Sequence, residues 1–276
     1  MGRGRVWGVA GLAVLCVLAG VLLRGSALEL DVFHTINAWG PMAPVWWSSW
    51  SVAGLGASVI ILVAAGGAER AQALVTWLLV LVLGGLALHA VKFALDGPRP
   101  LAVLGAAHMH VVGAALTRHA MPSGHSATGF ALAALALGLG WRGWPWYFVA
   151  ALLVALSRLA VGAHWPSDAL VGSGLGLLSG LIGTQWPAAQ RLAVRWGQGL
   201  QSRVGSRLTA AALVALGGGF WVSDTDYPDA LAVQAAIAVL GAWAGWRWWT
   251  AHGTGWPPAV TCLPQPASSA AQEDAA

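Results

Sequence analysis

The sequence predicts an all-α fold, a polytopic bundle of membrane-spanning helices, and two observations support that prediction. Hydrophobic residues make up 58% of the 276 positions and charged residues only 9%, whereas soluble domains carry about 25% charged residues. The apolar residues also gather in successive runs, several of them close to the ~20 residues that a helix needs to cross a bilayer. Lipid rather than water is therefore expected to surround most of the chain.

The apolar runs predict a six-helix core followed by two further C-terminal membrane helices, with six helices in total as the alternative. In chain order the runs are 6–23, 45–66, 71–95, 124–139, 145–161, 168–186, 208–221 and 229–249. The shorter runs can cross a bilayer only with local thinning of the membrane or with help from flanking residues. Tryptophan, present 18 times, clusters at several predicted helix ends, which is typical of the aromatic belts at membrane surfaces.

The first run follows Arg3 and Arg5, in the charge order of a signal peptide. It is longer than the ~7–15 apolar residues of a signal core, and further runs follow, so we interpret it as an uncleaved first membrane helix. A cleaved signal that ends near Ala27 is the alternative.

Charge placement predicts the orientation of the bundle, because short loops rich in Arg or Lys stay on the cytoplasmic side. The loops on one side carry most arginines, namely Arg3, Arg5, Arg70, Arg142, Arg191, Arg195, Arg203 and Arg207. The other side receives the long 96–121 loop and the acidic residues Glu29, Asp31, Asp224, Asp226 and Asp229. We therefore expect an inner-membrane protein with both termini inside.

The chain is predicted to have three parts. Residues 1–190 form the membrane core, 191–250 hold a basic cytoplasmic loop and the two extra helices, and 251–276 form a disordered tail rich in Pro, Ser and Ala. The formal charge of +4 and the pI near 9.8 do not indicate nucleic-acid binding, because the arginines are dispersed without interleaved aromatic residues. Membrane lipids are the expected surroundings, and no obligate protein partner is inferred.

Three polar islands interrupt the apolar core. They are Lys92-x6-Arg99-Pro100, Pro122-Ser123-Gly124-His125 and Ser157-Arg158-x5-His164-x3-Asp168. Lys92 is the only lysine in the sequence, and Asp168 is the only acidic residue between Asp96 and Asp224. Ionisable groups in membrane segments usually mark a functional site, and the predicted topology places all three islands at the outer face.

These residue types suit the binding and transfer of phosphate. A phosphoryl group spreads negative charge over its equatorial oxygens during displacement, so a site without a metal needs fixed cations and amide donors. Lys92, Arg99 and Arg158 supply charge, while Ser123 and Gly124 begin a predicted helix whose free N–H groups favour an anion. His164 stands four residues before Asp168, so the carboxylate can accept from one ring nitrogen and leave the other as a nucleophile.

The three islands, in this order, resemble the signature of the type 2 phosphatidic acid phosphatase superfamily. The resemblance implies a membrane-bound lipid phosphatase without metal or cofactor. It implies that His164 attacks to form a phosphohistidine, that Asp168 orients it, and that His125 protonates the leaving group and later activates water. Lys92, Arg99, Ser123, Gly124 and Arg158 would bind the phosphate of a lipid substrate.

Several alternatives remain at the level of sequence. Undecaprenyl diphosphate is the favoured substrate, with lipid A, phosphatidylglycerol phosphate and phosphatidic acid as others, and a phosphotransferase would use the same residues. Lys92 and Arg158 could merely extend toward the membrane surface, and a transporter without hydrolase activity is a more distant alternative, although transporter sites usually lie near the midplane. His108 and His110 could bind a metal, but no Cys or second carboxylate accompanies them.

Overall fold

The structure is a computed structural model that describes residues 2–251. All regular elements in this range are helices, which confirms the predicted all-α class. In chain order they are α1 (Arg3–Leu23), α2 (Ala27–Asn37), α3 (Pro44–Ala53), α4 (Gly56–Ala64), η1 (Ala68–Arg70), α5 (Ala71–Leu95), α6 (Pro100–Leu104), α7 (Gly124–Gly138), α8 (Trp144–Ala160), α9 (Pro166–Gln185), α10 (Pro187–Gln201), α11 (Arg203–Val222), η2 (Pro228–Ala230) and α12 (Leu231–Thr250). The predicted disordered tail lies outside the described residues from position 252 onward.

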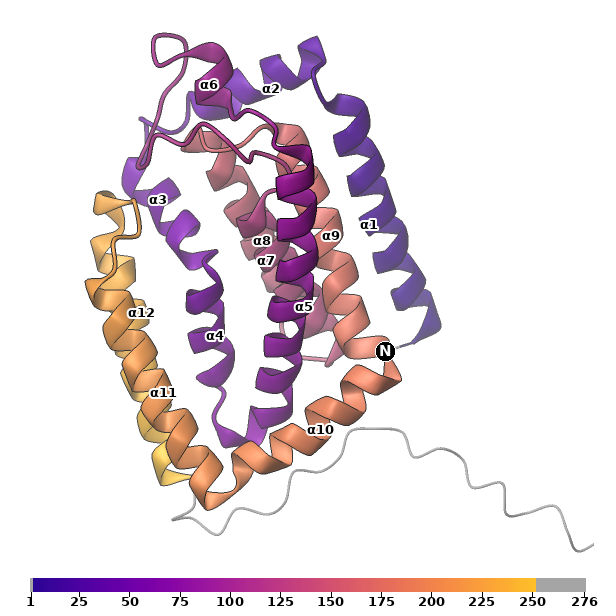
Figure 1. Ribbon diagram of the computed structural model, residues 1–276, viewed down its shortest axis with the longest axis vertical. Helices are drawn as coiled ribbons and strands as arrows, with labels where there is room; N and C mark the ends of the chain where they lie inside the picture. Colours follow the sequence, from indigo (N-terminus) through magenta and orange to yellow (C-terminus); the bar gives the residue numbers. More distant parts are fainter. Residues whose placement is uncertain (1, 252–276) are drawn as a thin grey trace, which may run out of the picture.

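The long helices form a bundle with two distinct ends (Figure 1). Helices α2 and α6 and the loop after α6 cover one end, which we call the upper end. The start of α1, the end of α12 and the whole of α10 lie at the opposite, lower end. The beginning and the end of the described chain therefore share one end, as the predicted topology requires.

Each predicted membrane run coincides with a helix or a helix pair, but not all of them are apolar enough to qualify as spans alone. Among the described residues, three helical stretches have the length and hydropathy of a span, and the bent pair α3–α4 makes up to four. Helices α7 and α8, with 15 and 17 residues, are short. Helix α9 is largely buried inside the bundle, so its surroundings are protein rather than lipid.

The second run was predicted to be one continuous helix, and this prediction was wrong. It is broken between Ala53 and Gly56, where α3 and α4 meet at 68°. Gly54 explains the close packing there, since a Cβ at this position would lie 2.5 Å from Val154 Cγ1 and 3.4 Å from His125 Cδ2. Gly54 and Gly56 flank the break, but glycine is common within membrane helices, so these residues did not mark it in the sequence.

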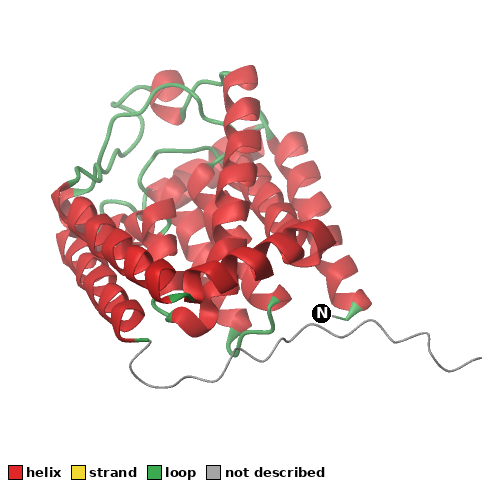
Figure 2. Cartoon of the chain, turned by 60° about the horizontal axis from the view of Figure 1, so that its bottom comes forward, coloured by secondary structure: helices red, strands yellow, loops and turns green. Residues whose placement is uncertain are grey.

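The basic segment after α9 was predicted to be a loop, and this too was wrong. It forms helix α10, which crosses the lower end of the bundle (Figures 1 and 2). Ala193 and Gly197 are buried, with Gly197 close to the backbone of α5, while Arg191 and Arg195 are exposed. The helix is therefore amphipathic, and α11 begins at Arg203 rather than near 208.

Helix α9 lies unusually close to α7. Gly172 and Gly176 stand four positions apart on its buried face, and a Cβ at either would overlap the backbone oxygen of Ser123 or Ala127. Small residues at this spacing let helix backbones approach in membrane proteins. The approach brings the first turns of α7 and α9 together at the upper end, and Ser123 N donates to Asp168 O at 2.9 Å.

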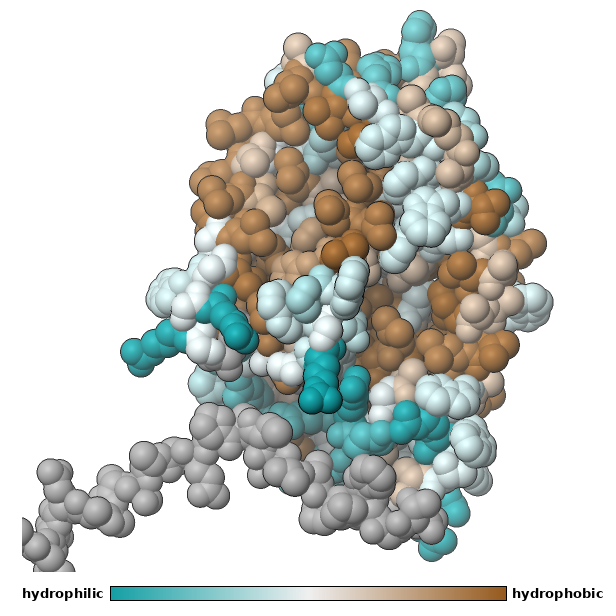
Figure 3. Space-filling model, turned by 180° about the vertical axis from the view of Figure 1, so that it is seen from behind, coloured by the Kyte–Doolittle hydropathy of each residue, from teal (hydrophilic) through white to brown (hydrophobic). Residues whose placement is uncertain are grey.

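The outer surface of the bundle is apolar. Viewed from behind, hydrophobic residues cover much of the middle of the molecule, and hydrophilic residues gather near its upper and lower ends (Figure 3). Large side chains such as Trp7, Leu22, Leu86 and Val222 are more than half exposed. Such a surface is expected of a protein that faces hydrocarbon rather than water.

Candidate active site

The upper end gathers every predicted site residue. Lys92 lies in the last turn of α5 and Arg158 in the last turn of α8. Ser123 caps α7, and Gly124 and His125 form its first turn. Arg99 precedes α6, His164 lies between α8 and α9, and Asp168 lies in the first turn of α9. The three islands thus meet at one place although they are spread over more than 70 positions of the sequence.

His164 and Asp168 form a buried pair. His164 Nδ1 lies 3.3 Å from Asp168 Oδ2, and each side chain is only 2% exposed. The same oxygen accepts the backbone N–H of Trp165 at 2.9 Å, so Asp168 also caps α9. Asp168 therefore both contacts His164 and caps α9, whose N-cap residue is Trp165.

Arg99 approaches the other side of the same imidazole. Its Nη1 lies 3.3 Å from His164 Nε2 and donates to Ala163 O at 2.9 Å. Its Nε donates to Arg118 O at 2.7 Å and Nη2 to His119 O at 3.4 Å. The guanidinium therefore ties the loop between α6 and α7, which we call the upper loop, to the His164 segment. It lies beside Nε2, within reach of the oxygens of a phosphoryl group on that nitrogen.

The partners of His164 define its chemical state. With the carboxylate at Nδ1, the proton lies on that nitrogen and Nε2 presents its lone pair. Burial, and then the charge of Arg99, hold the pKa of the His164 imidazole well below its ordinary value. The ring therefore stays neutral in mildly acidic solution where an exposed histidine is protonated, and a neutral imidazole can act as a nucleophile.

The start of α7 supplies polar groups beside the pair. Ser123 is fully buried, and its Oγ accepts from Ser126 Oγ at 3.0 Å, which leaves its own proton free for a ligand. A Cβ at Gly124 would meet only Leu88 Cδ2, at 3.9 Å, so the protein itself leaves room there. His125 Nε2 is buried without a hydrogen-bond partner among the described residues. Such an atom is expected to be satisfied by a ligand or water.

Two further cations complete the cluster. The Arg158 side chain is 2% exposed, and its Nη1 donates to Tyr227 Oη at 2.7 Å. Lys92 is partly buried, and the charges of Arg99, Arg158 and Asp168 all act on it. Three cations outnumber the carboxylate of Asp168 and that of Glu29, which lies at Ser167, so the site is net positive and suits an anion.

Buried polar residues outside the three islands, which are not among the predicted site residues, hold this arrangement. Glu29 Oε1 accepts Ser167 N at 3.0 Å, so the first turn of α2 helps to cap α9. Asn37, 1% exposed, donates to His110 O at 2.8 Å and accepts from His110 N at 2.7 Å. The only sequence signal was the Ser26-x-x-Glu29 capping pattern, in which Glu29 N donates to Ser26 Oγ at 3.1 Å.

The two histidines of the upper loop that were considered as metal ligands make local contacts. His108 Nδ1 lies 3.1 Å from Leu104 O, and the backbone of His110 binds Asn37. Across residues 2–251 no group of three or more His, Cys, Asp or Glu side chains could hold a metal ion. The donor set at the upper end is cationic and fits an anion.

Comparison with known proteins agrees with the fold and the motifs. The family model described as the PAP2 superfamily matches residues 73–192, which include all three islands. Over 67 residues the chain is 48% identical to the lipid A 1-phosphatase of Porphyromonas gingivalis, a match that covers 22% of this chain and 15% of that relative. The crystal structure of Aquifex aeolicus LpxE aligns with a TM-score of 0.51 and 23% identity, over 59% of this chain and 98% of that one.

The bundle is therefore a PAP2-type membrane fold with a cationic site at one end. Residues 73–192 match the PAP2 superfamily, which confirms the resemblance predicted from the three islands. Helices α11 and α12 lie beyond the matched segment.

Proposed function

We propose that this protein is an integral-membrane phosphatase that hydrolyses a lipid phosphate or diphosphate through a phosphohistidine on His164. The observation that carries the proposal is the position of the His164 ring, with Asp168 at one nitrogen and the Arg99 guanidinium at the other. Metal-independent phosphoryl transfer needs a nucleophile beside fixed positive charge, and both are present.

The reaction has two steps. The Nε2 lone pair of His164 attacks phosphorus while the bond to the lipid oxygen breaks, and His125 protonates that departing oxygen. Water then attacks the phosphohistidine, His125 takes up a proton from it, and inorganic phosphate leaves as the nitrogen–phosphorus bond breaks. Arg99, Arg158 and Lys92 stabilise the charge on the transferred oxygens in both steps.

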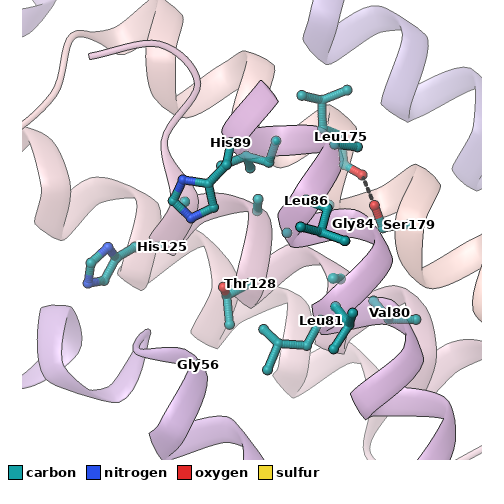
Figure 4. Close-up of a pocket in the computed structure, with 18 of the residues that line it drawn as sticks. Gly56, Val80, Leu81, Gly84, Leu86, His89, His125, Thr128, Leu175 and Ser179 are labelled. Atoms are coloured by element: carbon teal, nitrogen blue, oxygen red, sulfur yellow. Dashed lines mark hydrogen bonds between the residues drawn. The ribbon is translucent and has the colours of Figure 1, made fainter. Parts of the chain in front are cut away.

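A groove supports the assignment of a lipid substrate. A cavity of about 580 Å³ runs along α5 between α4, α7 and α9, and its walls are mainly apolar, with Val80, Leu81 and Leu86 among the lining residues. His89 and His125 lie at one end of it (Figure 4). A hydrocarbon chain in this groove would leave its phosphate beside His125.

Among lipid phosphates we propose lipid A as the first substrate to test. The relative from Porphyromonas gingivalis is named a lipid A 1-phosphatase, and this supports lipid A over undecaprenyl diphosphate, which the sequence analysis favoured. The cationic cluster itself binds phosphate and does not distinguish the two lipids.

Purified protein in detergent is expected to release inorganic phosphate from lipid A in the presence of EDTA, because its own side chains supply the positive charge. Orthovanadate, which imitates pentavalent phosphorus, should inhibit. The measurement is phosphate release from lipid A, undecaprenyl diphosphate and phosphatidylglycerol phosphate in parallel. Release from none of them would contradict the proposal, and loss of activity in EDTA that Mg²⁺ restores would contradict the metal-independent mechanism. Transfer to a second lipid without free phosphate would indicate a phosphotransferase.

Two glycine variants sharpen that experiment. A Cβ at Gly85 on the wall of the groove would meet no atom within 4 Å, so Gly85→Phe fills the groove without a clash at Cβ. It should lower kcat/KM for a long-chain lipid phosphate by about tenfold and leave a water-soluble short-chain phosphate unaffected. Gly11→Phe on the exposed face of α1 is the matched control. An equal effect on both substrates would rule out the groove as the chain-binding site.

We also propose that the upper end faces the periplasm or the outside of the cell, because the arginine-rich segments lie at the lower end. With Cys16 and Cys262 replaced by alanine, a cysteine at Ala106 in the upper loop should react with an impermeant thiol reagent in intact cells. A cysteine at Gly199 in α10 should react only after lysis, since both positions are exposed but lie at opposite ends. The reverse labelling pattern would place the site at the cytoplasmic surface.

A further inference from the structure

Helices α11 and α12 form a C-terminal hairpin that contacts the Arg158 side chain of the site through one residue, Tyr227. Tyr227 lies between α11 and α12, beyond the segment that matches the superfamily. We propose that Tyr227 is a positioning residue for Arg158 and that this is the function of the hairpin at the active site. The proposal deepens the phosphatase assignment and rests on it for the role of Arg158.

The contact is short and buried. Arg158 Nη1 donates to Tyr227 Oη at 2.7 Å, and the guanidinium carbon lies 5.7 Å from the centre of the tyrosine ring. Arg158 is 2% exposed and Tyr227 is 6% exposed. Within residues 2–251 no carboxylate pairs with Arg158, and its Nε has no partner. Tyr227 therefore fixes the Nη1 atom of the guanidinium, whereas the Nε atom remains without a partner among the described residues.

A tyrosine hydroxyl suits this position chemically. It accepts a hydrogen bond from Arg158 without carrying a formal charge, so the guanidinium keeps its full positive charge for a phosphate. An Asp or Glu at the same place would neutralise the arginine and compete with the substrate oxygens. A buried arginine without any partner would carry a large desolvation cost, which the hydrogen bond and the ring face reduce.

Tyr227 is itself held in place from two sides. Gly113 of the upper loop packs against the ring of Tyr227, since a Cβ on Gly113 would lie 2.7 Å from Tyr227 Cε1. Gln234, 3% exposed, donates to Phe220 O at 2.7 Å and to Ser223 O at 2.8 Å, which fixes the turn that follows α11. The hydroxyl is therefore presented by an ordered turn.

The hairpin is anchored to the rest of the bundle. Trp248 on α12 is fully buried, and its Nε1 donates to Ala64 O of α4 at 2.8 Å. Helices α11 and α12 approach closely at Gly217 and Gly241, where a Cβ on Gly241 would lie 3.0 Å from Gly217 Cα. Figure 1 shows the two helices side by side along α4. The position of Tyr227 is thus coupled to the packing of the bundle.

The first test measures the binding of orthovanadate to purified protein by calorimetry, which does not depend on knowing the lipid. Tyr227→Phe keeps the ring and removes the hydroxyl, and it should weaken vanadate binding about tenfold, as expected for a hydrogen bond to a charged group. Tyr147→Phe, which changes the other tyrosine of the chain, should bind as the wild type does. Equal affinity of Tyr227→Phe and wild type, or no binding to the wild type, would overturn the proposal.

The second test asks whether Tyr227 acts through Arg158. In an Arg158→Lys background, which keeps a charge but loses the planar fork, Tyr227→Phe should weaken vanadate binding by less than about twofold. A further tenfold loss in that background would show an independent, merely structural effect and overturn the proposal. Absence of lipid phosphate hydrolysis in the wild type would count against the phosphatase assignment alone, because the vanadate measurements would still report on Tyr227.

Discussion

His164→Ala is expected to lower the hydrolysis of lipid phosphates to below about one per cent of the wild-type rate, because it removes the nucleophile on which both steps depend. The histidine lies between Asp168 and Arg99, and alanine offers no atom there that can form a bond to phosphorus. The variant should still insert into the membrane, because His164 lies between α8 and α9 and its substitution alters no apolar helix. Phosphate release and the amount of membrane-extracted protein are the two measurements.

His108→Ala is the matched control, because this histidine is exposed in the upper loop, and the variant should keep wild-type activity. Rapid quenching with a radiolabelled substrate should trap an acid-labile, base-stable phosphoprotein in the wild type and none in His164→Ala. Activity of His164→Ala above about one per cent would remove this residue from the nucleophilic role.

Arg99→Lys is expected to reduce kcat about 100-fold, which is the usual effect of losing one preorganised donor at a developing charge. Lysine keeps the positive charge, but it cannot donate at once to Arg118 O, Ala163 O and the oxygens of a phosphoryl group on His164. The loop that carries Arg118 should also become less firmly attached to the His164 segment. Steady-state kinetics with a lipid phosphate and proteolysis of the upper loop would measure the two effects.

Arg118→Ala is the matched control for that experiment. The Arg118 side chain is 71% exposed and pairs with Asp96 on the surface, and such a pair contributes little stability. Its backbone carbonyl, which binds Arg99, remains in the variant. Wild-type kcat in Arg99→Lys, or an equal loss in Arg118→Ala, would show that the fork of Arg99 has no special role.

Hydropathy and charge alone were sufficient to predict the general architecture. The hydrocarbon core of a membrane offers no water to bind backbone N–H and C=O groups, so these groups must bind one another. A long apolar run therefore almost always forms a helix. For that reason the predicted runs coincide with α1, α5 and the other long helices. The same rule failed at Gly54, where close contact with Val154 and His125 accompanies a break in the helix, and it did not detect the amphipathic α10.

The sequence by itself determined the class of helix bundle, the motifs that predict phosphate chemistry and the end of the bundle at which they meet. These properties follow from local composition and from the length of apolar runs, and neither depends on contacts between distant segments. Only the tertiary structure decided which partners these residues have. Arg158 and Tyr227 are 69 positions apart, and no periodicity or motif connects them, because their contact depends on how α11 and α12 pack against α4. The groove beside His125 likewise exists only where four helices meet, since its shape depends on their packing distances rather than on any one segment.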